Sequence, residues 1–300
     1  MAQLEQVQQQ IMQAIHQADL PDDFMTKVNQ YYTPLAEYID HWSRQKHQPL
    51  LLSLQGPQGA GKSTLCHFLQ LILEHQFNHK VAVLSLDDFY LTQSQRQSLS
   101  KSVHPLLKTR GVPGTHDVDL AFKTLTALKH GRSVALPRFD KAQDNPFPES
   151  EWPQSPADVS IILFEGWCNH APVSSDEELI EPANMLERLE DPQRIWRSYV
   201  NQQLAHYHER LFTLCDALLC LLIPSFDLVY EWRGLQEQKL KATSAGQGIM
   251  TPEQIRRFID HFERISRRTM SHLPQHADAT ISMNEQHQLV NLTINTETIT

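Results

Sequence analysis

The stretch Gly56-Pro57-Gln58-Gly59-Ala60-Gly61-Lys62-Ser63 decides the fold, because it fits the pattern G-x-x-x-x-G-K-[ST] of a phosphate-binding loop. A short apolar run, residues 50–54, precedes it, and residues 64–73 carry apolar side chains at helical spacing. A strand, a glycine-rich turn and a helix in this order surround an anion with backbone N–H groups and the positive end of the helix. We therefore expect a nucleoside triphosphate, ATP, to bind residues 56–63 together with Thr64.

Two side chains of this loop carry chemistry of their own. Lys62 can reach the β- and γ-phosphates and stabilise charge on them, and the Ser63 hydroxyl can hold Mg²⁺. A phosphate-binding loop alone does not separate an ATPase, a GTPase, a transporter motor and a small-molecule kinase. The sequence contains neither the guanine-reading pattern N-K-x-D nor the transporter signature L-S-G-G-Q, which argues against two of these classes.

The composition of the chain limits which classes of partner it can bind. The formal net charge of −9 over 300 residues argues against a nucleic-acid groove, which needs clustered Lys and Arg. The longest apolar run, residues 217–223, is too short to span a membrane, and the N-terminus lacks the features of a secretory signal. The four cysteines show no C-x-x-C spacing. We expect a cytoplasmic protein with reduced thiols, as a monomer or homodimer, with no nucleic-acid or membrane partner.

Hydrophobic periodicity predicts the architecture. Buried-strand runs at 50–54, 81–86, 160–164 and 217–223 are separated by helical patterns, and strand-like runs at 279–283 and 289–294 close the chain. This alternation predicts an α/β fold: a doubly wound, mostly parallel sheet flanked by helices, formed by residues 49–300. Between residues 91 and 156 the periodicity weakens, apart from a helix-like stretch at 120–129. An irregular region of that length is usually functional.

The first 48 residues are rich in Gln and carry apolar residues at helical spacing. They predict an N-terminal helical extension of two or three helices packed on the core, with breaks at Pro21 and Pro34. A partner-binding or regulatory role for this segment is the alternative.

Acidic residues follow two of the predicted strands. Glu165 ends the third, where phosphate-loop proteins place a carboxylate of the Mg²⁺ shell; a solvent-exposed Glu is the alternative. Asp87 and Asp88 end the second, which we expect to neighbour the first. A carboxylate there could accept the proton of an attacking hydroxyl or help to hold the metal. Because successive side chains of an extended chain alternate, only one of the pair should point into the site, the other being a loop or solvent residue.

The residues S-L-D-D-F-Y at 85–90 and F-E-G at 164–166 resemble the phosphoribulokinase/uridine kinase/pantothenate kinase family. In that family the first Asp of the D-x-F-[YL] stretch is the catalytic base, so the resemblance favours Asp87. Within the family, the segments R-G-V-P-G-T-H-D at 110–117, P-R-F-D-K at 137–141 and Y-E-W-R-G-L-Q-E at 230–237 resemble plant-type D-glycerate 3-kinase and its bacterial and fungal relatives. The resemblance spans roughly residues 50–285.

The resemblance implies an ATP- and Mg²⁺-dependent kinase that phosphorylates a small hydroxy acid, with D-glycerate giving 3-phosphoglycerate as the first candidate. The acceptor carboxylate suits a bidentate arginine, and the acceptor hydroxyls suit hydrogen-bonding side chains. The candidates are Arg110, Arg138 and Arg233 for the carboxylate and His116 and Asp117 for the hydroxyls. For each arginine, a surface ion pair or a phosphate contact is an equal alternative. A nucleoside- or pantothenate-type kinase and an ATP-dependent switch without a small-molecule acceptor stay open.

Overall fold

A six-stranded sheet organises the computed structural model, which describes residues 2–21, 23–234 and 251–295. The strands lie in the order β2 (Val81–Ser85), β5 (Ile161–Gly166), β1 (Leu50–Gln55), β6 (Ala217–Leu222), β7 (Ala279–Met283) and β8 (Leu289–Ile294). The first five run parallel and β8 is antiparallel to β7. The prediction of a mostly parallel sheet is confirmed.

The position of β2 corrects one expectation. β2 pairs with β5, with Ser85 opposite Glu165, and β5 in turn pairs with β1. The strand that precedes Asp87 is therefore not the neighbour of the strand that precedes the phosphate loop. In doubly wound folds a crossover connection can leave room for a later strand, so neighbours in sequence need not be neighbours in space. As a result, Glu165 lies between the other two strand ends.

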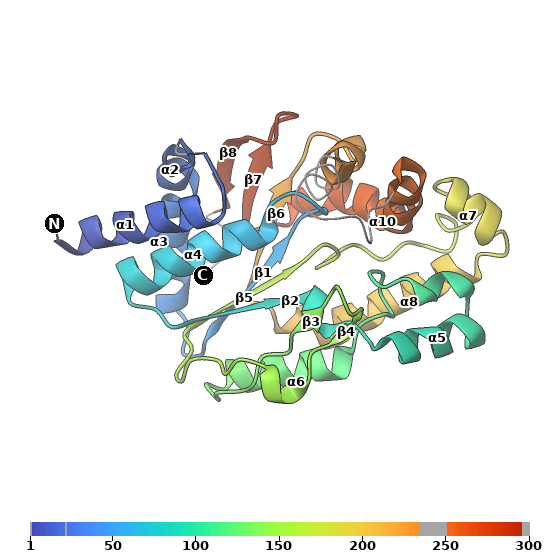
Figure 1. The fold of residues 1–300 in the computed structure, drawn as a ribbon, viewed down its shortest axis with the longest axis horizontal. Helices are drawn as coiled ribbons and strands as arrows, with labels where there is room; N and C mark the ends of the chain where they lie inside the picture. Colours follow the sequence, from blue (N-terminus) through green and yellow to red (C-terminus); the bar gives the residue numbers. More distant parts are fainter. Residues whose placement is uncertain (1, 22, 235–250, 296–300) are drawn as a thin grey trace.

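The central strands are buried on both faces. Leu50, Leu52 and Leu54 of β1 belong to one hydrophobic cluster, whereas Leu51 belongs to another on the opposite face. Figure 1 shows α1 (Ala2–Gln17), α2 (Phe24–Lys27), α3 (Thr33–Arg44) and α4 (Lys62–Phe77) on one side of the sheet. On the other side it shows α5 (Gln93–Ser102), α6 (Val118–Lys129) and α8 (Ile195–Arg210). The predicted doubly wound arrangement, with helices on both faces, is confirmed.

The N-terminal segment forms α1 (Ala2–Gln17) and then one continuous helical run, composed of α2 (Phe24–Lys27), the π-helical η1 (Val28–Tyr32) and α3 (Thr33–Arg44). The expected break at Pro21 is present. The expected break at Pro34 is wrong: this proline lies in the first turn of α3, directly after the π-helical turn. A local π-helical turn changes the hydrogen-bond spacing, which accommodates a residue that has no N–H.

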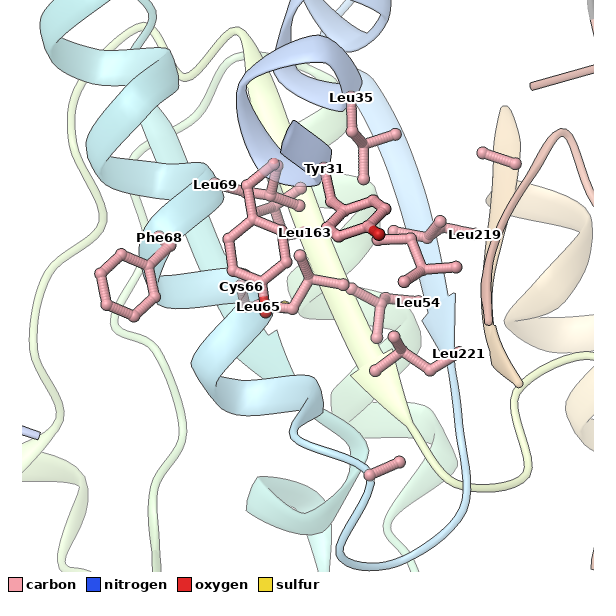
Figure 2. Close-up of a cluster of buried hydrophobic side chains, with 14 of the residues drawn as sticks. Tyr31, Leu35, Leu54, Leu65, Cys66, Phe68, Leu69, Leu163, Leu219 and Leu221 are labelled. Carbon is pink, nitrogen blue, oxygen red and sulfur yellow. The ribbon is translucent and has the colours of Figure 1, made fainter. Parts of the chain in front are cut away.

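The N-terminal helices share a hydrophobic core with the sheet. Figure 2 shows Tyr31 and Leu35 gathered in one cluster with Leu65 and Leu69 of α4 and with leucines of β1, β5 and β6. The division into residues 1–48 and 49–300 stays a prediction, because one cluster of buried side chains spans both. None of the helices in the described part of the chain combines the length and the apolar character that a membrane crossing needs.

The weakly periodic region from residue 91 to 156 contains more regular structure than the sequence indicates. Besides α6 it forms α5 (Gln93–Ser102), the 3₁₀ turns η3 (Pro105–Lys108) and η4 (Glu149–Glu151), and a short antiparallel pair, β3 (Phe139–Asp140) and β4 (Asn145–Pro146). Helix α5 has almost no apolar face. Its anchor is Arg96, a buried side chain that donates hydrogen bonds to the carbonyls of Leu91, Lys108 and Asp144.

Five further elements complete the described fold: η2 (Leu86–Phe89), α7 (Met185–Glu190), η5 (Phe212–Leu214), α10 (Pro252–His272) and η6 (Leu273–Gln275). The turn η2 follows the carboxyl end of β2, whereas η5 and η6 precede the amino ends of β6 and β7. Residues 227–234 are helical. The last three letters of the Y-E-W-R-G-L-Q-E segment, residues 235–237, lie outside the described residues.

Candidate active site

The phosphate-binding loop lies between β1 and α4 with the backbone geometry that its glycines allow. Gly59 and Gly61 have φ values of +81° and +86°, in the left-handed region that favours glycine. Gly61 is the N-cap of the 16-residue helix α4, and no side chain caps this end. The N–H groups of the first turn therefore face the loop with no side-chain acceptor, which is the arrangement that binds an anion.

The two chemically active side chains of the loop lie toward different partners. Lys62 Nζ donates a hydrogen bond to the carbonyl of Pro57 at 3.1 Å, within the loop itself. Ser63 Oγ donates to Glu165 Oε1 at 2.9 Å, and Glu165 is buried at the end of β5. A hydroxyl and a carboxylate are the oxygen ligands that Mg²⁺ prefers, and this ion usually takes few protein ligands beside phosphates and water. The pair therefore fits the ion, although the described residues contain no group of three or more His, Cys, Asp or Glu suited to a metal.

The two acids after β2 have separate surroundings. They lie in the 3₁₀ turn η2 and not on extended chain, so the alternation of strand side chains does not apply to them. Asp88 Oδ2 accepts hydrogen bonds from Ser85 N and Arg138 Nη1, and its Oδ1 accepts one from Phe139 N. Asp88 is thus a turn residue enclosed by structural partners, which fits the loop position expected for one of the two acids. Asp87 lines the cleft described below.

Asp87 is held from both sides. Tyr90 Oη donates to its Oδ1 at 2.7 Å, and Lys141 Nζ lies 2.9 Å from its Oδ2. Burial alone would raise the pKa of Asp87, but the charge and hydrogen bond of Lys141, followed by the hydrogen bond of Tyr90, together bring that pKa below its ordinary value. Asp87 is therefore a carboxylate at neutral pH, able to accept a proton or a hydrogen bond.

A cleft of about 550 Å³ opens at the carboxyl ends of β1, β5 and β2. It contains residues of the phosphate loop, two carboxylates, four cationic side chains and an aromatic wall. The carboxylates are Asp87 and Glu165; the cations are Lys62, Arg110, Lys141 and Arg233; the aromatic residues are Tyr90, Trp167, Phe258 and Phe262. A cleft with more cations than acids, in a chain of net charge −9, concentrates anionic ligands.

Two of the three predicted acceptor arginines line this cleft. Arg110 pairs with Asp144 and lies over the ring of Phe139 at 5.6 Å. Arg233 follows Trp232, whose side chain lies 3.5 Å from the position that a Cβ of Gly59 would occupy, which places Arg233 on the phosphate-loop side. Arg138 does not line the cleft.

His116 and Asp117 also lie outside the cleft lining. His116 stacks on Tyr90 with ring centroids 4.6 Å apart, and its Nδ1 lies 2.8 Å from the Tyr207 hydroxyl. Burial lowers the pKa of His116 to about 4, so the ring is neutral. Asp117 is the N-cap of α6 and accepts a hydrogen bond from Leu120 N at 2.9 Å. These two residues therefore contribute to the structure around the cleft, and His116 packs against the cleft residue Tyr90.

The aromatic wall of the cleft, formed by Tyr90, Trp167, Phe258 and Phe262, was not predicted from the sequence. Trp167 Nε1 donates to the carbonyl of Gly111 at 2.9 Å, and its ring meets Phe262 edge-on at 4.9 Å. Tyr90 belongs to the S-L-D-D-F-Y motif and Trp167 directly follows F-E-G, so motifs in the sequence mark both positions. Phe258 and Phe262 come from α10, far along the chain, and no local pattern distinguishes them from core residues of an amphipathic helix.

A glycine loop at the end of a parallel strand, with carboxylates at the carboxyl ends of the two strands beyond it, defines the P-loop class of phosphotransferases. The model of the "Phosphoribulokinase / Uridine kinase family" matches residues 51–181. An uncharacterised kinase of Schizosaccharomyces pombe is 32% identical over 238 residues, which cover 76% of this chain and 83% of that protein. The chain belongs to the phosphoribulokinase/uridine kinase family and is a kinase.

Two further relatives carry the name of a specific activity. The chloroplastic D-glycerate 3-kinase of Arabidopsis thaliana is 31% identical over 225 residues, covering 71% of this chain but 46% of the plant protein. The solved structure of D-glycerate 3-kinase from Cryptococcus neoformans is similar with a TM-score of 0.70 and 26% identity, over 87% of this chain and 99% of that one. The predicted resemblance to this family and to these kinases is confirmed.

Proposed function

We propose that this kinase uses ATP and Mg²⁺ to phosphorylate a hydroxyl of a small hydroxy acid, with D-glycerate as the acceptor and 3-phosphoglycerate as the product. The observation that carries the proposal is the position of Asp87, an ionised side chain in the same cleft as Lys62, Ser63 and Glu165. Two relatives named D-glycerate 3-kinase support the choice of acceptor.

On the nucleotide side, the loop N–H groups and Lys62 bind the β- and γ-phosphates and stabilise the charge that develops during transfer. Ser63 and Glu165 hold Mg²⁺, directly or through water. The ion, when bound, neutralises phosphate charge and orients the γ-phosphoryl group. Arg233, beside the phosphate loop, is suited to a phosphate contact as well as to the acceptor.

On the acceptor side, Asp87 orients the attacking hydroxyl and takes its proton. The acceptor oxygen forms a bond to the γ-phosphorus while the bond between that phosphorus and the bridging oxygen of ADP breaks. Because this transition state is loose, positioning the hydroxyl in line contributes more than strong basicity does. A carboxylate with a lowered pKa is adequate for that role.

Arg110 is the residue that we assign to the acceptor carboxylate. It lies in the cleft, where Asp144 and Phe139 contact its guanidinium group. The planar guanidinium fork matches the two oxygens of a carboxylate.

A second candidate follows from the aromatic wall. Trp167, Phe258 and Phe262 would also suit a nucleoside or another acceptor with an extended apolar part. A third candidate, a switch without a small-molecule acceptor, would hydrolyse ATP slowly and respond to no acceptor.

The test is ATP consumption with Mg²⁺ in the presence of D-glycerate, L-glycerate, uridine, pantothenate or ribulose 5-phosphate, with a control lacking any acceptor. Stimulation by D-glycerate alone supports the proposal. Stimulation by uridine or pantothenate supports the second candidate, a kinase for an acceptor with an extended apolar part. Slow hydrolysis that no acceptor increases favours the switch.

A further inference from the structure

Lys141 is a cleft residue to which no role has yet been assigned. It lies in the turn between β3 and β4, its side chain is 62% exposed, and its Nζ lies 2.9 Å from Asp87 Oδ2. Among the cations that line the cleft, Lys141 pairs directly with the proposed base. This contact places a positive charge where the acceptor hydroxyl must arrive.

The turn that carries Lys141 is held firmly. Asp140 Oδ1 accepts hydrogen bonds from the N–H groups of Ala142 and Gln143, at 2.8 and 3.1 Å. At the other end of the turn, the Asp144 carboxylate pairs with the buried guanidinium of Arg96 at 2.7 Å. Lys141 therefore extends into the cleft from a fixed backbone, and its flexible stem is the part that can change partner.

The same turn also positions Arg110. The carboxylate of Asp144 pairs with Arg110 as well as with Arg96, and the backbone carbonyl of Asp144 accepts a further hydrogen bond from Arg96. One turn thus supports two cationic side chains in the acceptor end of the cleft, Lys141 directly and Arg110 through Asp144. Of these two cations, Lys141 pairs with Asp87 of η2 and Arg110 pairs with Asp144.

On the side of the lysine, an exchange of partners costs little free energy. An ion pair with a mostly exposed lysine contributes little to stability, because water solvates the ammonium group in either arrangement. A neutral acceptor would leave Lys141 on Asp87, in competition with the incoming hydroxyl. An anionic acceptor offers Lys141 a second carboxylate and so releases an oxygen of Asp87.

We propose that Lys141 is an acceptor-binding residue that selects anionic alcohols: it pairs with Asp87 in the arrangement seen here and moves to the acceptor's carboxylate, beside Arg110, when the acceptor hydroxyl contacts Asp87. This inference rests on the proposed function and specifies its acceptor class, a small alcohol that carries a carboxylate. Asp87 keeps its contact with Tyr90 in both arrangements.

The experiment compares the full-length wild-type chain with Lys141→Met, Lys141→Arg and the control Lys123→Met, which alters an exposed lysine of α6 away from the cleft. Two constants are measured at saturating Mg-ATP: the KM for D-glycerate, and the inhibition constant of D-glyceramide, its neutral isostere, as a competitor of D-glycerate. Loss of a charge-assisted hydrogen bond weakens binding about tenfold or more. We expect Lys141→Met to raise the KM for D-glycerate about tenfold and to leave the inhibition constant of D-glyceramide within about twofold, with partial recovery in Lys141→Arg and no change in Lys123→Met.

Each other result overturns the inference. An equal rise in the KM for D-glycerate and in the inhibition constant of D-glyceramide would show that Lys141 shapes the cleft and does not recognise the charge of the acceptor. A fall in kcat alone would place Lys141 on the transferred phosphoryl group. If neither constant changes in Lys141→Met, Lys141 does not contact the acceptor. If the wild-type chain does not phosphorylate D-glycerate at all, the proposed function fails first and this inference falls with it, so the two failures are distinguishable.

Discussion

Tyr90 connects the proposed base to a buried histidine: its hydroxyl donates to Asp87 Oδ1 at 2.7 Å, and its ring stacks on His116 with centroids 4.6 Å apart. His116 in turn contacts the hydroxyl of Tyr207, which also accepts a hydrogen bond from Gly114 N. The R-G-V-P-G-T-H-D segment therefore acts on the site indirectly. Its His116 positions the ring of Tyr90, and the hydroxyl of Tyr90 binds Asp87.

Replacing Asp87 tests its assignment as the base. Asp87→Asn keeps the shape of the side chain but removes the proton acceptor, so we expect kcat to fall by about 10² to 10⁴ while the affinity for ATP is retained. The matched control is Asp88→Asn, because Asp88 contacts Ser85, Phe139 and Arg138 instead of lining the cleft. Steady-state kinetics with a separate nucleotide-binding measurement would check this. Unchanged turnover in Asp87→Asn would remove the assignment.

Tyr90→Phe removes one hydrogen bond to Asp87 and retains the aromatic ring. The hydrogen bond of Tyr90 is one of the interactions that lower the pKa of Asp87, so its loss raises that pKa. Because the base must be ionised, we expect the acidic limb of the pH profile of kcat/KM to move to higher pH, with kcat lower by about tenfold. Tyr38→Phe, at an exposed tyrosine of α3, is the control. A profile of unchanged shape would contradict the role given to Tyr90.

Gly111 allows the R-G-V-P-G-T-H-D segment (residues 110–117) to approach α10 closely. Its φ is +134°, and a Cβ at this position would lie 2.5 Å from the ring of Phe262. We expect Gly111→Ala to lower the free energy of unfolding by more than about 2 kcal/mol, through backbone strain and overpacking together. Gly131→Ala is the matched control: its φ of +69° is also left-handed, but a Cβ there meets nothing within 4 Å, so it should cost about 1 kcal/mol. Equal losses in chemical denaturation would contradict the packing argument.

Two buried histidines should make the free energy of unfolding depend on pH. Burial lowers the pKa values of His116 and His261 to about 4, whereas an unfolded histidine has its ordinary pKa near 6.5. Between these values the unfolded chain binds protons that the folded chain excludes, so the free energy of unfolding falls as pH falls from about 6.5 to 4. The slope is at most about 1.4 kcal/mol per pH unit for each histidine.

Denaturation curves measured across that pH range, with two variants, test this linkage. His261→Gln should reduce the slope by the contribution of one histidine. His47→Gln, at an exposed position, should leave it unchanged. A slope that is the same in the wild type and in His261→Gln would show that other groups cause the acid sensitivity.

The sequence was sufficient for the class of fold and for the phosphate loop, because each depends on local patterns. The glycines of 56–61, the apolar runs and the helical spacing act within a few residues of one another. Spatial order is a different matter. Nothing in residues 81–86 indicates that β5 lies between β2 and β1, since that depends on how the crossover connections pack.

The site was predicted in part for the same reason. Arg110 and Arg233 reach the cleft, but so does Lys141, which we had no reason to pair with Asp87, because 54 residues separate them in the chain. His116, Asp117 and Arg138 lie in recognisable motifs, yet their contacts are with Tyr207, Leu120 and Asp88. A motif shows which residues belong together, and the packing of α8 and η2 around them determines which ones face the ligand.

Identification of the product tests the central claim most directly. D-Glycerate, ATP and Mg²⁺ are incubated with the protein, and the phosphorus-containing products are identified by ³¹P nuclear magnetic resonance. We predict ADP and 3-phosphoglycerate in equal amounts, with neither formed by Lys62→Ala. ADP accompanied only by inorganic phosphate would contradict phosphoryl transfer to this acceptor, whatever the rate of ATP consumption.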